Sequence, residues 1–164
     1  AENLFLLSTE AGYGFLVKLG DLHVNKKAGK TALKVPEGAR VLPPQPVTDP
    51  QHDRLIVVTT QGHILAFVAG ELPLLPKGKG VKIIGIPSAK VAKREEFVAG
   101  IAICRAGQSA LLRTGNGELV LAPKDIARYV GERAHRGTKL SKANRAVRGV
   151  EVIEAASPQT RLPL

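Results

Sequence analysis

Residues 55–72 read LIVVTTQGHILAFVAGEL, an apolar run, a short turn with Gly62 and a second apolar run. β-Branched and aliphatic residues favour strands, and a turn glycine tolerates the positive φ that a tight hairpin demands. The same order of features occurs in LFLLSTEAGYGFLVKLGDL (4–22) and in ALLRTGNGELVLAPKDI (110–126). The sequence therefore predicts three β-hairpins.

The spacing within the three copies is regular. A threonine stands three residues before the turn glycine in each copy, in the pairs Thr9 and Gly12, Thr59 and Gly62, and Thr114 and Gly117. Self-similarity of this kind is the signature of a repeat architecture. We place the repeats at approximately 1–50, 51–105 and 106–153, and expect a flexible C-terminal tail over 154–164.

Helical patterning is nearly absent from the sequence. The best candidate is SAKVAKREEF (88–97), for which we expect a short helix with Ser88 as its N-cap. Because an isolated hairpin is marginal in water, the three units must pack on one another as the blades of a propeller do. The predicted fold is all-β, with about three antiparallel blades in an open arc.

The composition indicates a polyanionic partner. The chain of 164 residues contains 24 Lys and Arg against 14 Asp and Glu, a net charge of +10, and such a field attracts polyanions. Aromatic residues make up only 4%, whereas single-strand binders stack bases on aromatic rings, so duplex is favoured. Cys104 is the only cysteine, which excludes an internal disulfide and a cysteine zinc site. Without a membrane-length apolar run or a signal pattern, we expect a cytoplasmic protein.

The basic residues are patterned by the repeat. Windows 22–35, 76–90 and 133–150 contain 4, 4 and 6 Lys and Arg residues and no Asp or Glu. Glycines in these windows would let backbone N–H groups approach phosphate oxygens. If equivalent loops reach one rim, their charges form a continuous track that suits bent DNA. The candidate DNA-binding residues are Lys26, Lys27, Lys30, Lys34, Lys77, Lys79, Lys82, Arg133, Arg136, Lys139, Lys142, Arg145 and Arg148, with the loop glycines Gly29, Gly78, Gly80 and Gly137.

The basic residues of the third window recur at every third position from Arg133 to Arg148. In a strand this period alternates faces, whereas in an extended three-fold segment it makes one stripe. The sequence leaves both conformations open. It also leaves open whether the stripe is a phosphate track or a solvated basic edge that discourages aggregation.

These features together resemble the C-terminal domain of the A subunit of bacterial DNA topoisomerase IV, a relative of the DNA gyrase A C-terminal domain. The resemblance rests on AGYGF (11–15), NKKAGKTALKVPEGARVLPP (25–44), LPKGKGVKIIGIPSA (75–89) and GERAHRGTKL (131–140), and it runs to about residue 153. It implies a β-pinwheel of four-stranded blades with exchanged strands. Three repeats fall short of the five or six blades usual in the family, so we expect part of a longer domain.

The resemblance also implies a function. The family's domain binds and bends duplex DNA along its rim and steers substrate choice in ATP-dependent relaxation and decatenation. ATP and Mg²⁺ would be used by other domains, and no cofactor is expected in this chain. The implied partners are the topoisomerase IV catalytic core, with its B subunit, and a condensin-type SMC protein, with no membrane, and the implied location is the nucleoid.

One motif separates the two branches of this family. The gyrase domain carries the box Gln-Arg-Arg-Gly-Gly-Lys-Gly, and here PKGKGVK (76–82) matches only its last three positions, at Gly78, Lys79 and Gly80. The missing glutamine and arginine pair favour topoisomerase IV over a gyrase-type wrapping domain. A propeller-like scaffold for protein partners is the other alternative.

No catalytic or metal-binding residue is predicted. AGKT (28–31) and PKGKGVK both lack the spacing of a P-loop. The four histidines lie far apart, without carboxylate or cysteine partners at metal-ligand spacing. Tyr13 and Tyr129 are interpreted as structural residues, because neither has the surroundings of a strand-cleaving nucleophile.

Overall fold

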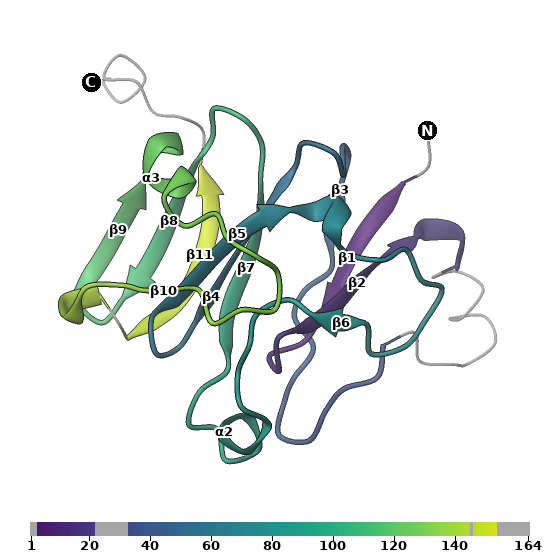
Figure 1. Ribbon diagram of the computed structural model, residues 1–164, viewed down its shortest axis with the longest axis horizontal. Helices are drawn as coiled ribbons and strands as arrows, with labels where there is room; N and C mark the ends of the chain where they lie inside the picture. Colours follow the sequence, from purple (N-terminus) through teal and green to yellow (C-terminus); the bar gives the residue numbers. More distant parts are fainter. Residues whose placement is uncertain (1–2, 22–32, 145, 154–164) are drawn as a thin grey trace.

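The computed structural model describes residues 3–21, 33–144 and 146–153. Within these ranges three antiparallel sheets lie side by side along the long axis of the molecule (Figure 1). The all-β prediction is confirmed. Within the same ranges, no helix is long and apolar enough to cross a membrane.

The first sheet has the strand order β3-β1-β2-β6. Its strands are β1 (Leu4–Ser8), β2 (Tyr13–Lys18), β3 (Gln45–Val47) and β6 (Val81–Lys82). Strands β1 and β2 form the hairpin predicted over residues 4–22, and Gly12 in the turn between them has φ of +87°. The turn glycine therefore has the left-handed conformation that the sequence indicated.

The second sheet has the strand order β10-β5-β4-β7. Its strands are β4 (Arg54–Thr59), β5 (His63–Val68), β7 (Val98–Cys104) and β10 (Thr138–Lys139). A single-turn 3₁₀ helix, η1 (Ala69–Glu71), follows β5. The predicted hairpin over 55–72 is thus the β4–β5 pair at the centre of this sheet.

The third sheet has the order β11-β8-β9. It consists of β8 (Ser109–Thr114), β9 (Gly117–Leu121) and β11 (Val147–Ile153), and a short η2 helix (Lys142–Asn144) precedes β11. This sheet has three strands among the described residues, whereas the other two have four. The four-stranded blades implied by the family resemblance are therefore complete in two sheets.

The helix prediction was partly wrong. Helix α2 covers only Ser88–Ala92, and its N-cap is Pro87, whose extended backbone presents its carbonyl to the amide N–H of Lys90 and Val91. Ser88 is therefore the first helical residue rather than the cap. The helix ends early because Arg94, two residues beyond it, has φ of +59°, which a right-handed helix does not allow.

A second short helix, α3 (Pro123–Ala127), was not predicted. Its sequence nevertheless has helix-start signals, with proline at the first position and Asp125 at the third. The Asp125 carboxylate accepts a hydrogen bond of 3.0 Å from the N–H of Ala122. This contact satisfies a backbone donor next to the first turn of the helix.

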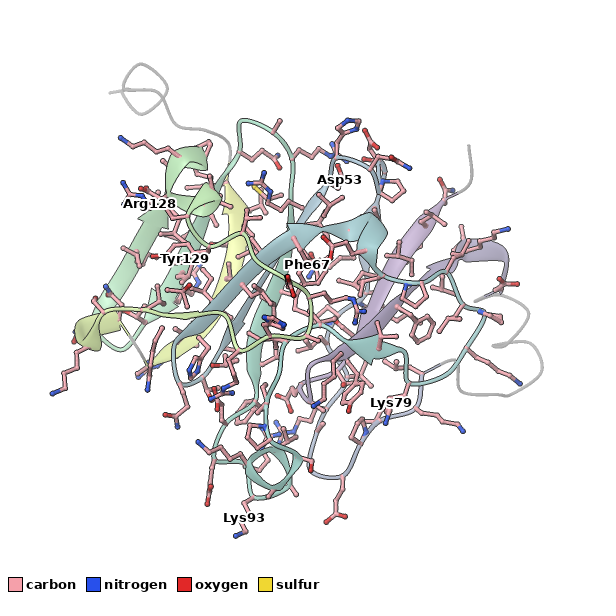
Figure 2. The ribbon with its side chains drawn as sticks, viewed as in Figure 1. Asp53, Phe67, Lys79, Lys93, Arg128 and Tyr129 are labelled. Carbon is pink, nitrogen blue, oxygen red and sulfur yellow. The ribbon has the colours of Figure 1, made fainter. Side chains whose placement is uncertain are left out.

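The second sheet is buried on both faces. From β4, Leu55 and Val57 belong to the core cluster shared with the first sheet, whereas Ile56 and Val58 belong to the cluster shared with the third. Phe67 on β5 belongs to the first cluster and lies near the centre of the molecule in Figure 2. A strand covered on both sides needs no polar alternation, which explains the unbroken apolar run LIVV.

Neighbouring repeats exchange strands. Strand β6 lies in the second repeat of the sequence but pairs with β2, matching Tyr13 with Lys82. Strand β10 lies in the third repeat but pairs with β5, matching His63 with Lys139. The first and second sheets therefore each hold the next repeat by a two-residue strand, and these strands come from the basic windows.

Two of the predicted loop glycines make this exchange possible. Gly80 precedes β6 with φ of +84°, and Gly137 precedes β10 with φ of +77°. A Cβ at Gly80 would overlap the carbonyl oxygen of Gly14, and one at Gly137 would overlap that of Ile64. Their close approach is therefore to the neighbouring hairpin, a reason for glycine that the sequence did not reveal.

We expect Gly80→Ala to destabilise the fold by about 2 to 4 kcal/mol, because it adds positive-φ strain and a backbone overlap at one site. Urea unfolding would measure the loss. Gly149→Ala is the matched control, because Gly149 has no positive φ and no atom near a built Cβ. A Gly80→Ala protein as stable as the Gly149→Ala protein would contradict this role for Gly80.

Candidate nucleic-acid interface

Most of the predicted DNA-binding residues fall within the described chain. Lys26, Lys27, Gly29, Lys30 and Arg145 lie outside the described residues. Among the rest, Lys34, Lys77, Lys79, Lys82, Lys139, Lys142 and Arg148 are exposed. The described residues therefore include part of each of the three basic windows.

The first and second basic windows touch. Leu33 forms an isolated parallel bridge with Gly78, and the N–H of Lys34 donates a 2.9 Å hydrogen bond to the carbonyl oxygen of Gly78. These residues are separated by more than forty positions in the sequence. Lys34 is thus held beside the 76–82 loop.

The 76–82 loop presents its lysines outward. Lys79 lies with its Nζ 4.4 Å from the centroid of the Tyr13 ring, a cation–π contact that orients it at the edge of the first sheet (Figure 2). Gly78 has φ of +129° and no atom within 4 Å of a built Cβ. Unlike Gly80, Gly78 has open space beside its backbone, so a ligand could approach the backbone there.

The second and third windows also touch. Arg133 donates from Nη1 to the carbonyl oxygen of Lys82 at 2.8 Å, and the N–H of Ala134 donates to the carbonyl of Ile83 at 2.9 Å. Gly85 in turn donates to the carbonyl of His135 at 2.9 Å. We call the described segments 33–34, 76–82 and 133–139 the basic track, because contacts with backbone carbonyls join them in that order.

Arg136 lies within the basic track, but its guanidinium makes contacts inside the protein. Its Nη1 donates to the carbonyl oxygen of Gly85 at 2.8 Å, and its Nη2 lies 2.9 Å from Oε1 of Glu96. The Glu96 side chain is fully buried, and the Arg136 side chain is 39% exposed. Arg136 therefore has a structural role, and a DNA phosphate would have to compete with the buried Glu96 carboxylate for its guanidinium.

Glu96 is the centre of a buried polar cluster. Its Oε2 accepts a hydrogen bond from the Thr59 hydroxyl at 2.8 Å and lies 2.9 Å from Nδ1 of His63. Burial acts to raise the pKa of Glu96, but the hydrogen bonds from Thr59, Arg136 and His63 outweigh it and hold the pKa below its ordinary value. Glu96 is therefore a buried carboxylate that stays ionised.

The shifted pKa values of His63 and Glu96 both make the folded protein less stable in acid. Burial lowers the pKa of His63, against the opposing effect of its hydrogen bond to Glu96, so the native state resists its protonation. Stability from His63 is present above pH 6.5, its ordinary value, and declines as pH falls below it. Stability from Glu96 is present above its ordinary value of 4.5 and is lost as pH falls through its lower folded pKa.

The every-third-residue spacing does not form one regular segment. Lys139 lies in β10, Lys142 in η2 and Arg148 in β11, so the spacing crosses three elements. Neither a single strand nor a single three-fold stripe describes the window. Lys139 continues the basic track, whereas Arg148 lies on the third sheet.

Sequence reasoning missed two carboxylates that pair with distant arginines. Besides Glu96, Glu10 in the β1–β2 turn pairs with Arg94, with Oε1 and Nη1 2.6 Å apart. Arg94 also donates to the carbonyl of Gly38 at 2.8 Å and stacks over the Phe97 ring at 3.8 Å. The available signal was an acidic residue next to an apolar run, but each arginine partner lies at least forty residues away.

The chain is similar to known topoisomerase chains. A family model described as the DNA gyrase C-terminal domain, a β-propeller, matches residues 3–48 and 53–105. The A subunit of DNA topoisomerase 4 from Pseudomonas aeruginosa is 46% identical over 141 residues, or 86% of this chain and 19% of that protein. The Escherichia coli counterpart is 35% identical over 158 residues, or 96% of this chain and 20% of that protein. The chain thus spans about a fifth of the length of these curated relatives.

Solved structures show the same fold. The E. coli ParC C-terminal domain superimposes with a TM-score of 0.81 and 34% identity, covering 93% of this chain and 61% of that one. A DNA gyrase A C-terminal domain gives a TM-score of 0.67 over 89% of this chain and 47% of that one. The latter is only 17% identical, so that likeness concerns the fold alone.

We expect Glu96→Gln to lower the unfolding free energy at pH 7 by about 2 kcal/mol. Breaking a buried ion pair costs about 3 to 5 kcal/mol, and the exposure of Arg136 reduces that figure. The variant should also lose the part of the acid-induced destabilisation that lies below pH 4.5. Urea unfolding between pH 3 and 7 would measure both effects.

The matched control is Glu132→Gln, which neutralises a carboxylate that is 81% exposed beside His135. We expect its stability to stay within about 0.5 kcal/mol of the parent. Equal stability of the two variants at every pH would show that the Glu96 cluster does not hold the structure together.

Proposed function

This chain belongs to the DNA gyrase C-terminal domain family of β-propellers, and we propose that it is the non-catalytic DNA-binding and DNA-bending domain of a topoisomerase IV A subunit. The observation that supports this proposal most is the basic track, in which contacts at Gly78 and Lys82 join basic segments of all three repeats. A track assembled from successive repeats offers a series of phosphate contacts to one ligand.

The track suits the shape and charge of a duplex rather than its sequence. Helices α2 and α3 have five residues each, too short to read bases along a major groove. Lysine and arginine contacts to phosphates fix the position of DNA without specifying sequence. Any preference would then come from how easily a given sequence bends along the arc of repeats.

The remnant of the gyrase box supports the topoisomerase IV assignment. Of its three matching residues, Gly80 is required for strand exchange, which leaves Gly78 and Lys79 to face a ligand. The identities of 46% and 35% to topoisomerase IV chains point the same way. We therefore favour DNA bending that steers substrate choice in relaxation and decatenation over gyrase-type wrapping.

The rest of the enzyme would supply the chemistry. We assign strand cleavage, ATP and Mg²⁺ to the N-terminal domains of the A subunit and to the B subunit. Within the described residues, no three His, Cys, Asp or Glu side chains group as metal ligands would. The same relationship makes a condensin-type SMC protein a candidate partner and the nucleoid the expected location.

We expect the combined change of Lys77, Lys79 and Lys82 to Ala to weaken duplex binding and leave stability within about 0.5 kcal/mol of the parent. Each lost phosphate contact reduces the slope of log K against log salt by roughly 0.9, so the slope should fall by about 2 to 3. Fluorescence anisotropy with a duplex of a few helical turns would measure it across a salt series.

The matched control removes the same charge outside the basic windows, by changing Lys93, Lys124 and Arg128 to Ala. These exposed residues lie on or next to α2 and α3. We expect a small change in affinity and an almost unchanged salt slope. Equal loss in the two triple variants, or an affinity of the parent that salt does not alter, would contradict the track as the DNA site and favour a protein-binding scaffold.

A further inference from the structure

A cavity of about 280 Å³ lies apart from the basic track. It is formed where β4 begins, where β7 joins β8 through residues 105–108, and where α3 packs on the third sheet. In Figure 1, α3 lies at the upper left of the molecule and α2 at its lower edge. No residue of the track lines this cavity.

Arg54 gives the cavity an uncompensated positive charge. It is the first residue of β4, is partly buried, and pairs through its backbone with Val68 and Cys104. Among the described residues, its guanidinium makes no hydrogen bond or ion pair. A guanidinium held at a cavity wall without a partner favours an anion there, because it cannot lose its charge.

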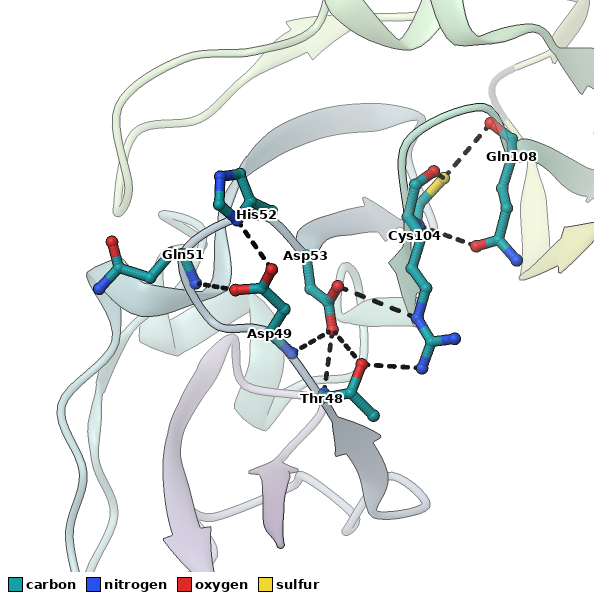
Figure 3. Close-up of polar contacts among 8 residues, drawn as sticks. Thr48, Asp49, Gln51, His52, Asp53, Cys104 and Gln108 are labelled. Atoms are coloured by element: carbon teal, nitrogen blue, oxygen red, sulfur yellow. Dashed lines mark hydrogen bonds and ion pairs between the residues drawn. The ribbon is translucent and has the colours of Figure 1, made fainter. Parts of the chain in front are cut away.

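Arg105, on the adjacent strand connection, also lines the cavity, but its guanidinium contacts residues outside the lining. Its Nη2 donates to the Thr48 hydroxyl at 2.8 Å, and its Nε lies 4.0 Å from Oδ1 of Asp53. The other oxygen of Asp53 accepts the N–H groups of Thr48 and Asp49 at 3.0 and 3.1 Å (Figure 3). Thr48 and Asp53 do not line the cavity, so the Arg105 guanidinium is held outside it, and Arg54 is the arginine that can contact a ligand there.

The remaining lining adds no negative charge. The cavity wall contains no Asp or Glu among the described residues. Burial raises the pKa of the Cys104 thiol, which stays protonated and donates weakly to the carbonyls of Arg105 and Gln108. His52 is held by Asp49, with its Nδ1 2.7 Å from a carboxylate oxygen that lies outside the lining (Figure 3).

We propose that this cavity binds a phosphate group at the guanidinium of Arg54. Its volume lies at the lower end of ligand pockets and suits a small phosphate compound or one phosphate of a larger ligand. Arginine is the side chain best matched to phosphate, because its planar fork donates two parallel hydrogen bonds. The phosphate can come from a small solute or from the backbone of a second duplex segment.

Titration of the 164-residue chain with inorganic phosphate tests the site, with NMR detection of backbone amides and chloride as the ionic-strength control. We expect saturable shifts concentrated at residues 105–108 and around Arg54. Arg54→Gln should weaken binding at least about tenfold, because it removes a charge-assisted contact. Arg128→Gln is the matched control and should bind within about twofold, since Arg128 is 75% exposed, does not line the cavity and lies 4.0 Å from Asp125.

Two further arms complete the test. Arg54→Lys keeps the charge without the fork and should bind more weakly than the parent but more tightly than Arg54→Gln, which guards against a folding defect in one variant. A short duplex that shifts the same amides, and loses this effect in Arg54→Gln, identifies a DNA phosphate as the ligand. A duplex that leaves them unshifted identifies a small phosphate compound. Shifts without saturation, or equal weakening by Arg54→Gln and Arg128→Gln, would overturn the proposal.

Discussion

Everything else in this molecule depends on the exchange of two short strands between repeats. Each of the strands β6 and β10 has only two residues, yet each joins one repeat to the hairpin of the repeat before it. The exchange needs a glycine with positive φ pressed against a backbone carbonyl, at Gly80 and Gly137. Because β6 and β10 lie within the basic windows, the same pairing that joins the repeats also brings basic segments of successive repeats into contact.

Burial and charge are balanced around that exchange. The second sheet has apolar residues on both faces, so its hairpin is held between its neighbours like a core element rather than a surface one. The buried carboxylate of Glu96 then ties Arg136, from the third repeat, to Thr59 and His63 of the second. One arginine of the basic track is thus used to fasten the track to the fold.

The features that depend on residues close together in the sequence could be predicted, whereas contacts between residues far apart in the sequence could not. The three hairpins follow from strand-forming residues on either side of a turn glycine, so residues 4–22, 55–72 and 110–126 could be located directly. Strands β6 and β10 are too short to have a period, and their partners are more than sixty residues away. The pairing of Arg136 with Glu96, forty positions apart, could not be predicted for the same reason, so the structural role of this arginine was missed.

In the function proposed for this domain, a single duplex follows the basic track through all three repeats. Cross-linkable residues placed one at a time at Lys34, Lys82 and Lys139 would test it directly, by mapping the reacted position on one end-labelled duplex. We predict three cross-links in that order along the duplex, because Lys34 adjoins Gly78 and Lys82 adjoins Arg133 at the start of the third segment. Cross-links that coincide, or that form from one repeat alone, would contradict a continuous track.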